Sequence, residues 1–118
     1  MADAQPTAKQ VQDEIAREIE RVHVESYGAG ASNIDVQVSE NLVVVIIDVE
    51  LAKNEQTLVH AGREESVQNT REAFQQAIAP TFTAIIERAT GRRVNSFASR
   101  MIMEPPWSVE LFRLEPAG

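Results

Sequence analysis

Residue types that usually carry out chemistry are sparse in this chain. Among its 118 residues are two histidines, His23 and His60, and no cysteine. The absence of cysteine excludes thiolate zinc sites, iron–sulfur clusters and a cysteine nucleophile. The two histidines are far apart in the sequence and have no third histidine to complete a ligand set. We therefore expect no transition-metal site and no cofactor.

Carboxylates occur in close pairs, an arrangement that acid–base catalysis uses. The pairs are Asp13 with Glu14, Asp48 with Glu50, and Glu64 with Glu65. Catalysis requires two carboxylates in different, partly buried environments, whereas these pairs have the pattern of solvent-exposed faces. Asp48 is the best candidate for a partly buried carboxylate, because it follows an apolar run. Since Walker A, Gly-x-Ser-x-Gly and Ser–His–Asp arrangements are absent too, the sequence predicts that the protein is not an enzyme. A weak activity centred on Asp48 stays an alternative.

A glycine-rich segment runs from Tyr27 to Ala31 and contains Gly28 and Gly30. Phosphate-binding glycine loops follow a strand and open a helix, so that backbone N–H groups gather at the helix N-terminus. This segment instead follows a predicted helix and precedes a predicted strand. A helix cap with a turn is therefore the main interpretation, and a binding role for Tyr27, Gly28 and Gly30 is the alternative.

Arginines gather in the second half of the chain. Arg88, Arg92, Arg93 and Arg100 fall within thirteen residues. Cations near a helix C-terminus interact favourably with its dipole, so a solvated surface explains them. The alternative is a small-anion or nucleotide site formed by Arg92, Arg93 and the glycine-rich segment, since guanidinium groups bind carboxylate and phosphate through two bonds.

Two amphipathic helices are predicted to position these residues. The first covers 8–26, with Val11, Ile15, Ile19 and Val22 on one face, and Thr7 is placed to cap it together with Gln10. The second begins at residue 63 or 64 and ends near 89, and we expect a kink at Pro80 and a left-handed cap at Gly91. Its apolar stripe consists of Val67, Phe74, Ile78, Phe82, Ile85 and Ala89.

Four strands are predicted at 34–38, 42–51, 92–103 and 107–114. The third breaks its alternation, which indicates a bulge near 97–99. The connection 52–62 has room for a short helical turn at 54–59. The order helix–strand–strand, repeated, predicts an α+β fold: a four-stranded antiparallel sheet of order 1-2-4-3, with both helices packed on one face. We expect one domain over 8–115, with flexible tails at 1–7 and 116–118.

This arrangement leaves one face of the sheet without helices. The second and fourth strands are apolar on both faces. The face without helices is therefore also expected to be buried against another surface. A second copy of the chain is the simplest candidate, which predicts a homodimer. A solvated face is the alternative. Trp107, which follows two prolines, is interpreted either as a half-buried residue at a strand start or as a partner-facing anchor.

The net charge of −7 belongs to the first 61 residues, which hold four basic and eleven acidic residues, whereas the remainder holds seven of each. An acidic chain repels phosphates, so nucleic acid is not an expected partner.

No apolar run approaches the roughly 20 residues of a membrane helix, and residues 1–6 lack the pattern of a signal peptide. We expect a soluble, cytoplasmic protein without direct membrane insertion.

Taken together, several segments resemble the MpsC family, also called DUF2294. They are residues 58–67, Arg71 with Phe74 and Pro80, residues 90–97, and residues 109–115. The glycine-rich segment departs from the family, with Ala29 in place of a basic residue and Ala31 in place of proline. The stretch 100–106 departs as well, where the family has a more acidic hairpin. The matched positions are Gly62, Arg63, Arg71, Gly91, Arg92 and Phe112.

The resemblance implies a small bacterial protein without established catalytic activity, associated with a membrane complex for ion or inorganic-carbon transport. At the start of the second helix, the positive charge of Arg63 gains nothing from the helix dipole. We therefore expect Arg63 to bind a specific acceptor near residues 48–50. The sequence thus predicts a non-enzymatic accessory or regulatory protein that acts by protein–protein contact. The alternative is a regulatory domain that binds a small anion or nucleotide near Arg92 and Arg93.

Overall fold

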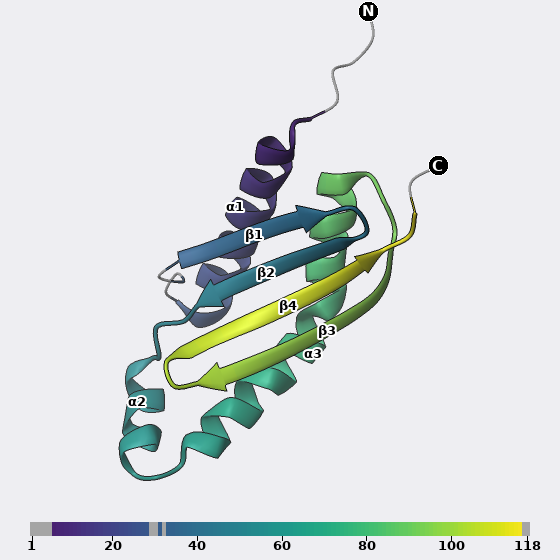
Figure 1. Ribbon diagram of the computed structural model, residues 1–118. Helices are drawn as coiled ribbons and strands as arrows, with labels where there is room; N and C mark the ends of the chain where they lie inside the picture. Colours follow the sequence, from purple (N-terminus) through teal and green to yellow (C-terminus); the bar gives the residue numbers. More distant parts are fainter. Residues whose placement is uncertain (1–5, 29–30, 32, 117–118) are drawn as a thin grey trace, which may run out of the picture.

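Seven elements build the chain in the computed structural model, which describes residues 6–28, 31 and 33–116. They are α1 (Ala8–Tyr27), β1 (Asn33–Ser39), β2 (Leu42–Asp48), α2 (Lys53–His60), α3 (Glu64–Thr90), β3 (Val94–Met103) and β4 (Pro106–Leu114). The strands form one antiparallel sheet of order β1-β2-β4-β3. Figure 1 shows the sheet in front and α1 and α3 together behind it. The predicted α+β class and strand order are confirmed.

Helix α1 begins and ends at the residues that its sequence indicates. The backbone N–H of Gln10 donates to Thr7 Oγ1 at 3.1 Å, and the N–H of Thr7 donates to Gln10 Oε1 at 2.8 Å, which completes a capping box. Gly28 ends the helix with a φ of 73°, a left-handed conformation that favours glycine. Ile15 and Ile19 are fully buried, so the predicted stripe faces the core.

The connection after β2 holds a complete helix rather than a single turn. Helix α2 spans eight residues, and none of them is buried. Helix α3 then continues through Pro80 to Gly91, whose φ of 69° gives the expected left-handed cap, and Figure 1 shows α3 changing direction part-way along its length. Two polar residues, Arg71 and Gln75, are buried within its apolar stripe.

Alternation along the strands separates an inner face, against the helices, from an outer face. On β2, Val43 and Val45 are fully buried, and Val44 between them is only half-buried. On β3 the register shifts between Val94 and Ser96, so the bulge predicted near 97–99 lies earlier in the strand. The shift brings Phe97 to the inner face, where its ring lies 5.1 Å from that of Phe112.

The β3 edge of the sheet is covered by side chains of α3. Gln68 Nε2 donates to the carbonyl of Met101 at 2.7 Å, and the N–H of Met101 donates to Glu72 Oε2 at 2.9 Å. Near the other end of the strand, the N–H of Val94 donates to Glu87 Oε2 at 2.9 Å. Edge strands normally expose these groups to added strands, so α3 closes this edge as well as covering the inner face.

Candidate functional site

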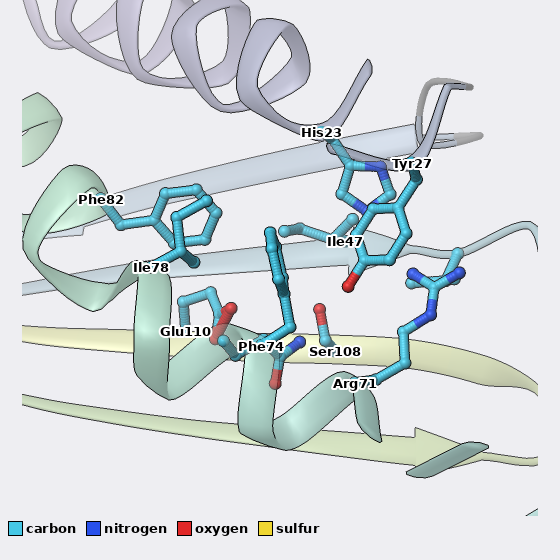
Figure 2. A pocket seen from close by; sticks show the side chains of 11 residues that line it. His23, Tyr27, Ile47, Arg71, Phe74, Ile78, Phe82, Ser108 and Glu110 are labelled. Carbon is cyan, nitrogen blue, oxygen red and sulfur yellow. The ribbon is translucent and has the colours of Figure 1, made fainter. Parts of the chain in front are cut away.

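A polar pocket lies inside the core, between the helices and the inner face of the sheet. Its polar lining residues are His23, Tyr27, Arg71, Gln75, Ser108 and Glu110. Figure 2 shows His23 and Tyr27 reaching it from α1, Arg71 and Phe74 from α3, and Ser108 and Glu110 from β4. The cavity measures about 10 Å³, which is room for about one water molecule.

Glu110 is the most unusual residue of this pocket. Its side chain is fully buried, and neither carboxylate oxygen accepts a hydrogen bond from any residue that the structure describes. Burial raises the pKa of Glu110 to about 7, an effect that Ser99 partly offsets, because an apolar environment disfavours the charged form. The hydroxyl of Ser99 itself donates to Gln75 Oε1 at 2.7 Å. Glu110 is therefore a carboxyl group that can hold its proton near neutral pH.

Arg71 anchors the end of the pocket that lies toward α2. Its Nε and Nη2 donate to Oε2 and Oε1 of Glu55 at 2.8 and 2.6 Å, and its side chain is only 3% exposed. Burial raises the pKa of Glu55, but the bonds from Arg71 and from the N–H of Ala52 outweigh it and lower the pKa below the ordinary value. The guanidinium carbon also lies 4.0 Å from the ring centre of Tyr27, so one side chain joins α1, α2 and α3.

Tyr27 closes the pocket on the α1 side. Its ring lies 4.8 Å from that of His23 and 5.2 Å from that of Phe74, the latter edge-on. Burial raises the pKa of Tyr27, and Arg71 opposes this effect. The sequence identified Tyr27 as a candidate binding residue, and the structure places it at the pocket but not in a phosphate-binding loop.

Chemically, the pocket is suited to hold a proton and to order the surrounding helices. No group of three or more metal-ligating side chains occurs among the described residues. A cavity of about 10 Å³ is far smaller than the few hundred cubic ångströms of ordinary ligand pockets. A nucleotide or a phosphorylated metabolite therefore does not fit into it.

Sequence reasoning missed Glu110 and the role of Arg71, although both carried a signal. Glu110 stands two residues before Phe112, which the alternation of the fourth strand assigns to the inner face. Arg71 lies four residues after Val67, on the stripe that α3 buries. A charged residue that falls at the spacing of the core positions indicates a buried polar group. The spacing of Glu110 from Phe112 and of Arg71 from Val67 was therefore the available signal.

The outer face of the sheet carries an apolar patch, which we call the outer patch. It consists of Val44, Ile46, Ile102, Trp107, Val109 and Leu111, all half-buried. Strand register makes the patch continuous, since Ile46 pairs with Val109, Val44 with Leu111, and Ile102 with Trp107. No helix of the described chain lies over it (Figure 1). Trp107, for which the sequence left open a half-buried strand start or a partner-facing anchor, is half-buried and belongs to this patch.

A family model matches residues 7–115, and its description is a Na+-translocating membrane potential-generating system (MpsC). The chain belongs to the MpsC family. The resemblance seen in the sequence is thereby confirmed, and membership associates the chain with a Na+-translocating membrane system. Neither the curated proteins nor the solved structures contain a match. None of the helices formed by the described residues has the length and apolar character needed to cross a membrane.

Arg92, a candidate anion ligand in this MpsC-family chain, is bonded instead to backbone and amide oxygens. Its Nε and Nη2 donate to the carbonyl of Glu115 at 3.2 and 2.6 Å. Its Nη1 donates to the carbonyl of Glu40, and its Nη2 also donates to Asn41 Oδ1, both at 2.5 Å. The side chain thus fastens the β1–β2 turn to the end of β4, and binding an anion would require breaking these bonds.

Gly28, another of the predicted anion-binding residues, is not brought together with Arg92. Gly28 lies before the start of β1, whereas Arg92 contacts the turn after its end. The seven residues of β1 span roughly 20 Å at the usual rise. Arg93 is exposed, and Gly30 lies outside the described residues. Among the described residues, the structure therefore does not bring Gly28 to Arg92 as the combined site requires.

Arg63 differs from its prediction. The residue is exposed and occupies the N-cap position of α3, and its backbone N–H donates to the carbonyl of Leu58 at 2.7 Å. Within the described part of the chain, its side chain forms no hydrogen bond or ion pair, so the acceptor expected near residues 48–50 is not found. The backbone geometry of the α2–α3 turn accounts for its position.

Proposed function

We propose that this MpsC-family chain is a non-enzymatic accessory protein of a Na+-translocating, membrane-potential-generating system, which it joins from the cytoplasm by protein–protein contact. Family membership supports the association with the system. The contact surface in this proposal is the outer patch. The single observation that carries it is a continuous apolar surface on a sheet face that no described helix covers.

Physical reasoning favours a protein partner for this surface. Monomeric proteins rarely leave a contiguous apolar patch in water, and such patches mark interaction sites. Large aromatic side chains are enriched where contacts contribute most to binding, and Trp107 stands within the patch. A sheet face is also self-complementary when it packs on a copy of itself. The proposal therefore includes a homodimer formed through the outer patch.

A lysine placed at the centre of the patch tests the proposal. Val109→Lys points its charge outward, so we expect the folded chain to remain but its contacts to fail. Gln76→Lys adds the same charge at an exposed position of α3 and serves as the matched control. The readouts are the mass in sedimentation experiments and the Na+-dependent membrane potential of cells that lack the native chain and carry the variant.

The expected result is loss of dimer mass and of the restored potential for Val109→Lys, with both retained for Gln76→Lys. Circular dichroism and a cooperative thermal transition confirm that each variant is folded. A folded Val109→Lys that restores the potential as fully as the wild type would overturn the contact role of the outer patch.

A further inference from the structure

Resting on the homodimer of the proposed function, we infer its arrangement: two outer faces pack about a two-fold axis parallel to the strands, so that Asp35 lies against the partner's Arg100. The occupant of the outer patch is thus a second copy of this chain in one defined orientation. The inference follows from strand register and from the charges at the two ends of one row of side chains.

One row across the outer face has opposite charges at its ends. Asp35 of β1 pairs with Ile46 of β2, Ile46 pairs with Val109 of β4, and Val109 pairs with Arg100 of β3. Paired residues on one face of a sheet stand side by side. The row therefore reads acidic, apolar, apolar, basic from one edge of the sheet to the other.

Strand alternation assigns both Asp35 and Arg100 to the outer face. Asp35 is exposed beside the buried Val36, and Gln37 Nε2 donates to Asp35 Oδ2 at 3.1 Å, as expected for residues two apart on one face. Arg100 precedes the fully buried Met101, and its side chain is 74% exposed. Neighbours along a strand point to opposite faces, so both side chains leave the sheet on the outer face, and the Arg100 guanidinium lies at the β3 edge near Glu72 of α3.

A two-fold axis parallel to the strands reverses the order of strands across the interface. It lays β1 over the partner's β3 and β2 over the partner's β4. Within the charged row, Ile46 then meets the partner's Val109, and Asp35 meets the partner's Arg100. A two-fold axis relates each copy to the other, so every contact between different residues occurs twice. Two such charge pairs therefore flank the apolar centre. Sheets pack face to face at about 10 Å, a gap that the long arginine side chain can cross.

Other arrangements of two copies are less favourable. An axis in the plane of the face but perpendicular to the strands lays β1 over the partner's β1. Asp35 then lies near the partner's Asp35 and Arg100 near the partner's Arg100, and like charges across an interface are unfavourable. Pairing through the β3 edge would have to displace Gln68 and Glu72, which bond to Met101.

Arg100 is free enough to change its contact. Its Nε lies 4.0 Å from Glu72 Oε2, a long approach between groups that both retain contact with solvent. Exposed ion pairs of this kind contribute little to stability. Pairing with Asp35 across a packed interface, where less water screens the charges, is therefore the more favourable use of the guanidinium group.

Reversing each charge tests this arrangement. Asp35→Arg and Arg100→Glu should each raise the dimer dissociation constant about tenfold or more, because each places like charges together. The double variant should return to within about threefold of the wild type, because it restores opposite charges. Arg88→Glu, an exposed arginine of α3, is the control and should leave the constant unchanged. Sedimentation equilibrium measures all four. A double variant as weak as the two single effects combined would overturn the inference.

Cross-linking reports the axis directly, because the chain has no cysteine of its own. Asp35→Cys and Arg100→Cys chains are mixed, and a bismaleimide with a spacer of about 10 Å, the sheet spacing, is added. The inferred axis predicts cross-links between position 35 of one copy and position 100 of the other. Efficient coupling of Asp35→Cys chains to one another would instead indicate the perpendicular axis and overturn the inference.

These outcomes separate the two proposals. If Val109→Lys abolishes contact and function while the charge swap shows no rescue, the proposed function stands and this axis is wrong. If the wild type stays monomeric at every concentration tested, the inference is overturned, and the membrane-potential assay decides whether the outer patch binds another protein.

Discussion

At the centre of β4, the two faces of the sheet depart from the arrangement expected of a monomer in water. The inner face buries Glu110 beneath two helices, while the outer face presents the apolar Val109 and Leu111 on either side of it in the sequence. Three consecutive residues thus place an acid inside and aliphatic groups outside. Under the proposed contact role, the outer face is a surface that a partner covers, and the inner face holds a polar pocket at a cost in stability.

The largest expected loss of stability on the inner side of the sheet comes from removing the buried cation of Arg71. Arg71→Ala leaves Glu55 poorly solvated and without its partner, and it removes the guanidinium from the ring of Tyr27. Breaking such a pair costs about 3–5 kcal/mol, which we expect urea denaturation to measure. Arg88→Ala, at an exposed arginine of the same helix, should change the free energy of unfolding by less than about 0.5 kcal/mol. A loss as small as this for Arg71→Ala would contradict the role of Arg71 in joining α1, α2 and α3.

A titration gives the next largest effect. The folded chain retains the proton of Glu110 up to a pKa of about 7, whereas the unfolded chain releases it near 4.5. Between these values the unfolded state binds fewer protons, so stability falls as the pH rises. The loss should approach about 3 kcal/mol above pH 7.

Glu110→Gln should remove this loss, because the amide has no proton to release. The measurement is the difference in unfolding free energy between the variant and the wild type at pH 5 and pH 8. Glu104→Gln, at an exposed glutamate, is the matched control and should follow the wild type at both values. Parallel pH profiles for wild type and Glu110→Gln would show that the buried carboxyl is not the group responsible.

Two adjacent valines of β2 compare the two faces directly, and their replacement gives the smallest expected effect. Val45 is fully buried on the inner face, while Val44 belongs to the outer patch. Val45→Thr places a hydroxyl in the core and should cost about 1–3 kcal/mol. Val44→Thr should change monomer stability by less than about 0.5 kcal/mol yet weaken self-association. Urea unfolding at low protein concentration and sedimentation at high concentration separate the two effects. Equal losses of stability for both variants would contradict the assignment of the faces.

Periodicity was sufficient to predict most of the fold. The spacing of Ile15 and Ile19 identified α1, and the order of elements predicted the sheet. Helix α2 was underestimated because eight residues without a buried face give little pattern. The phase of β3 revealed a bulge but not its place, because a phase break is compatible with several positions of the extra residue.

The candidate site was predicted less well, for a physical reason. Tyr27 was identified because it borders the glycine-rich segment, and Trp107 because large aromatic residues stand out by type. Glu110 and Arg71 were not identified as buried, since charged residues are usually exposed. Their burial depends on partners from other elements, such as Glu55 for Arg71, and no local pattern shows which elements will meet. Arg92 likewise bonds to residues more than twenty positions away.

Helix α2 has a consequence for how the molecule opens. None of its residues is buried, although Val59 packs at the margin of the core, and the bonds of Glu55 to Arg71 tie the helix to α3. A segment with so few buried contacts opens locally at low free energy while the rest stays folded. Its amide hydrogens should therefore exchange with solvent deuterium before those of β2 and β4. Glu55 holds α2 against α3 through these bonds, and we expect its replacement to let α2 fluctuate without unfolding the sheet.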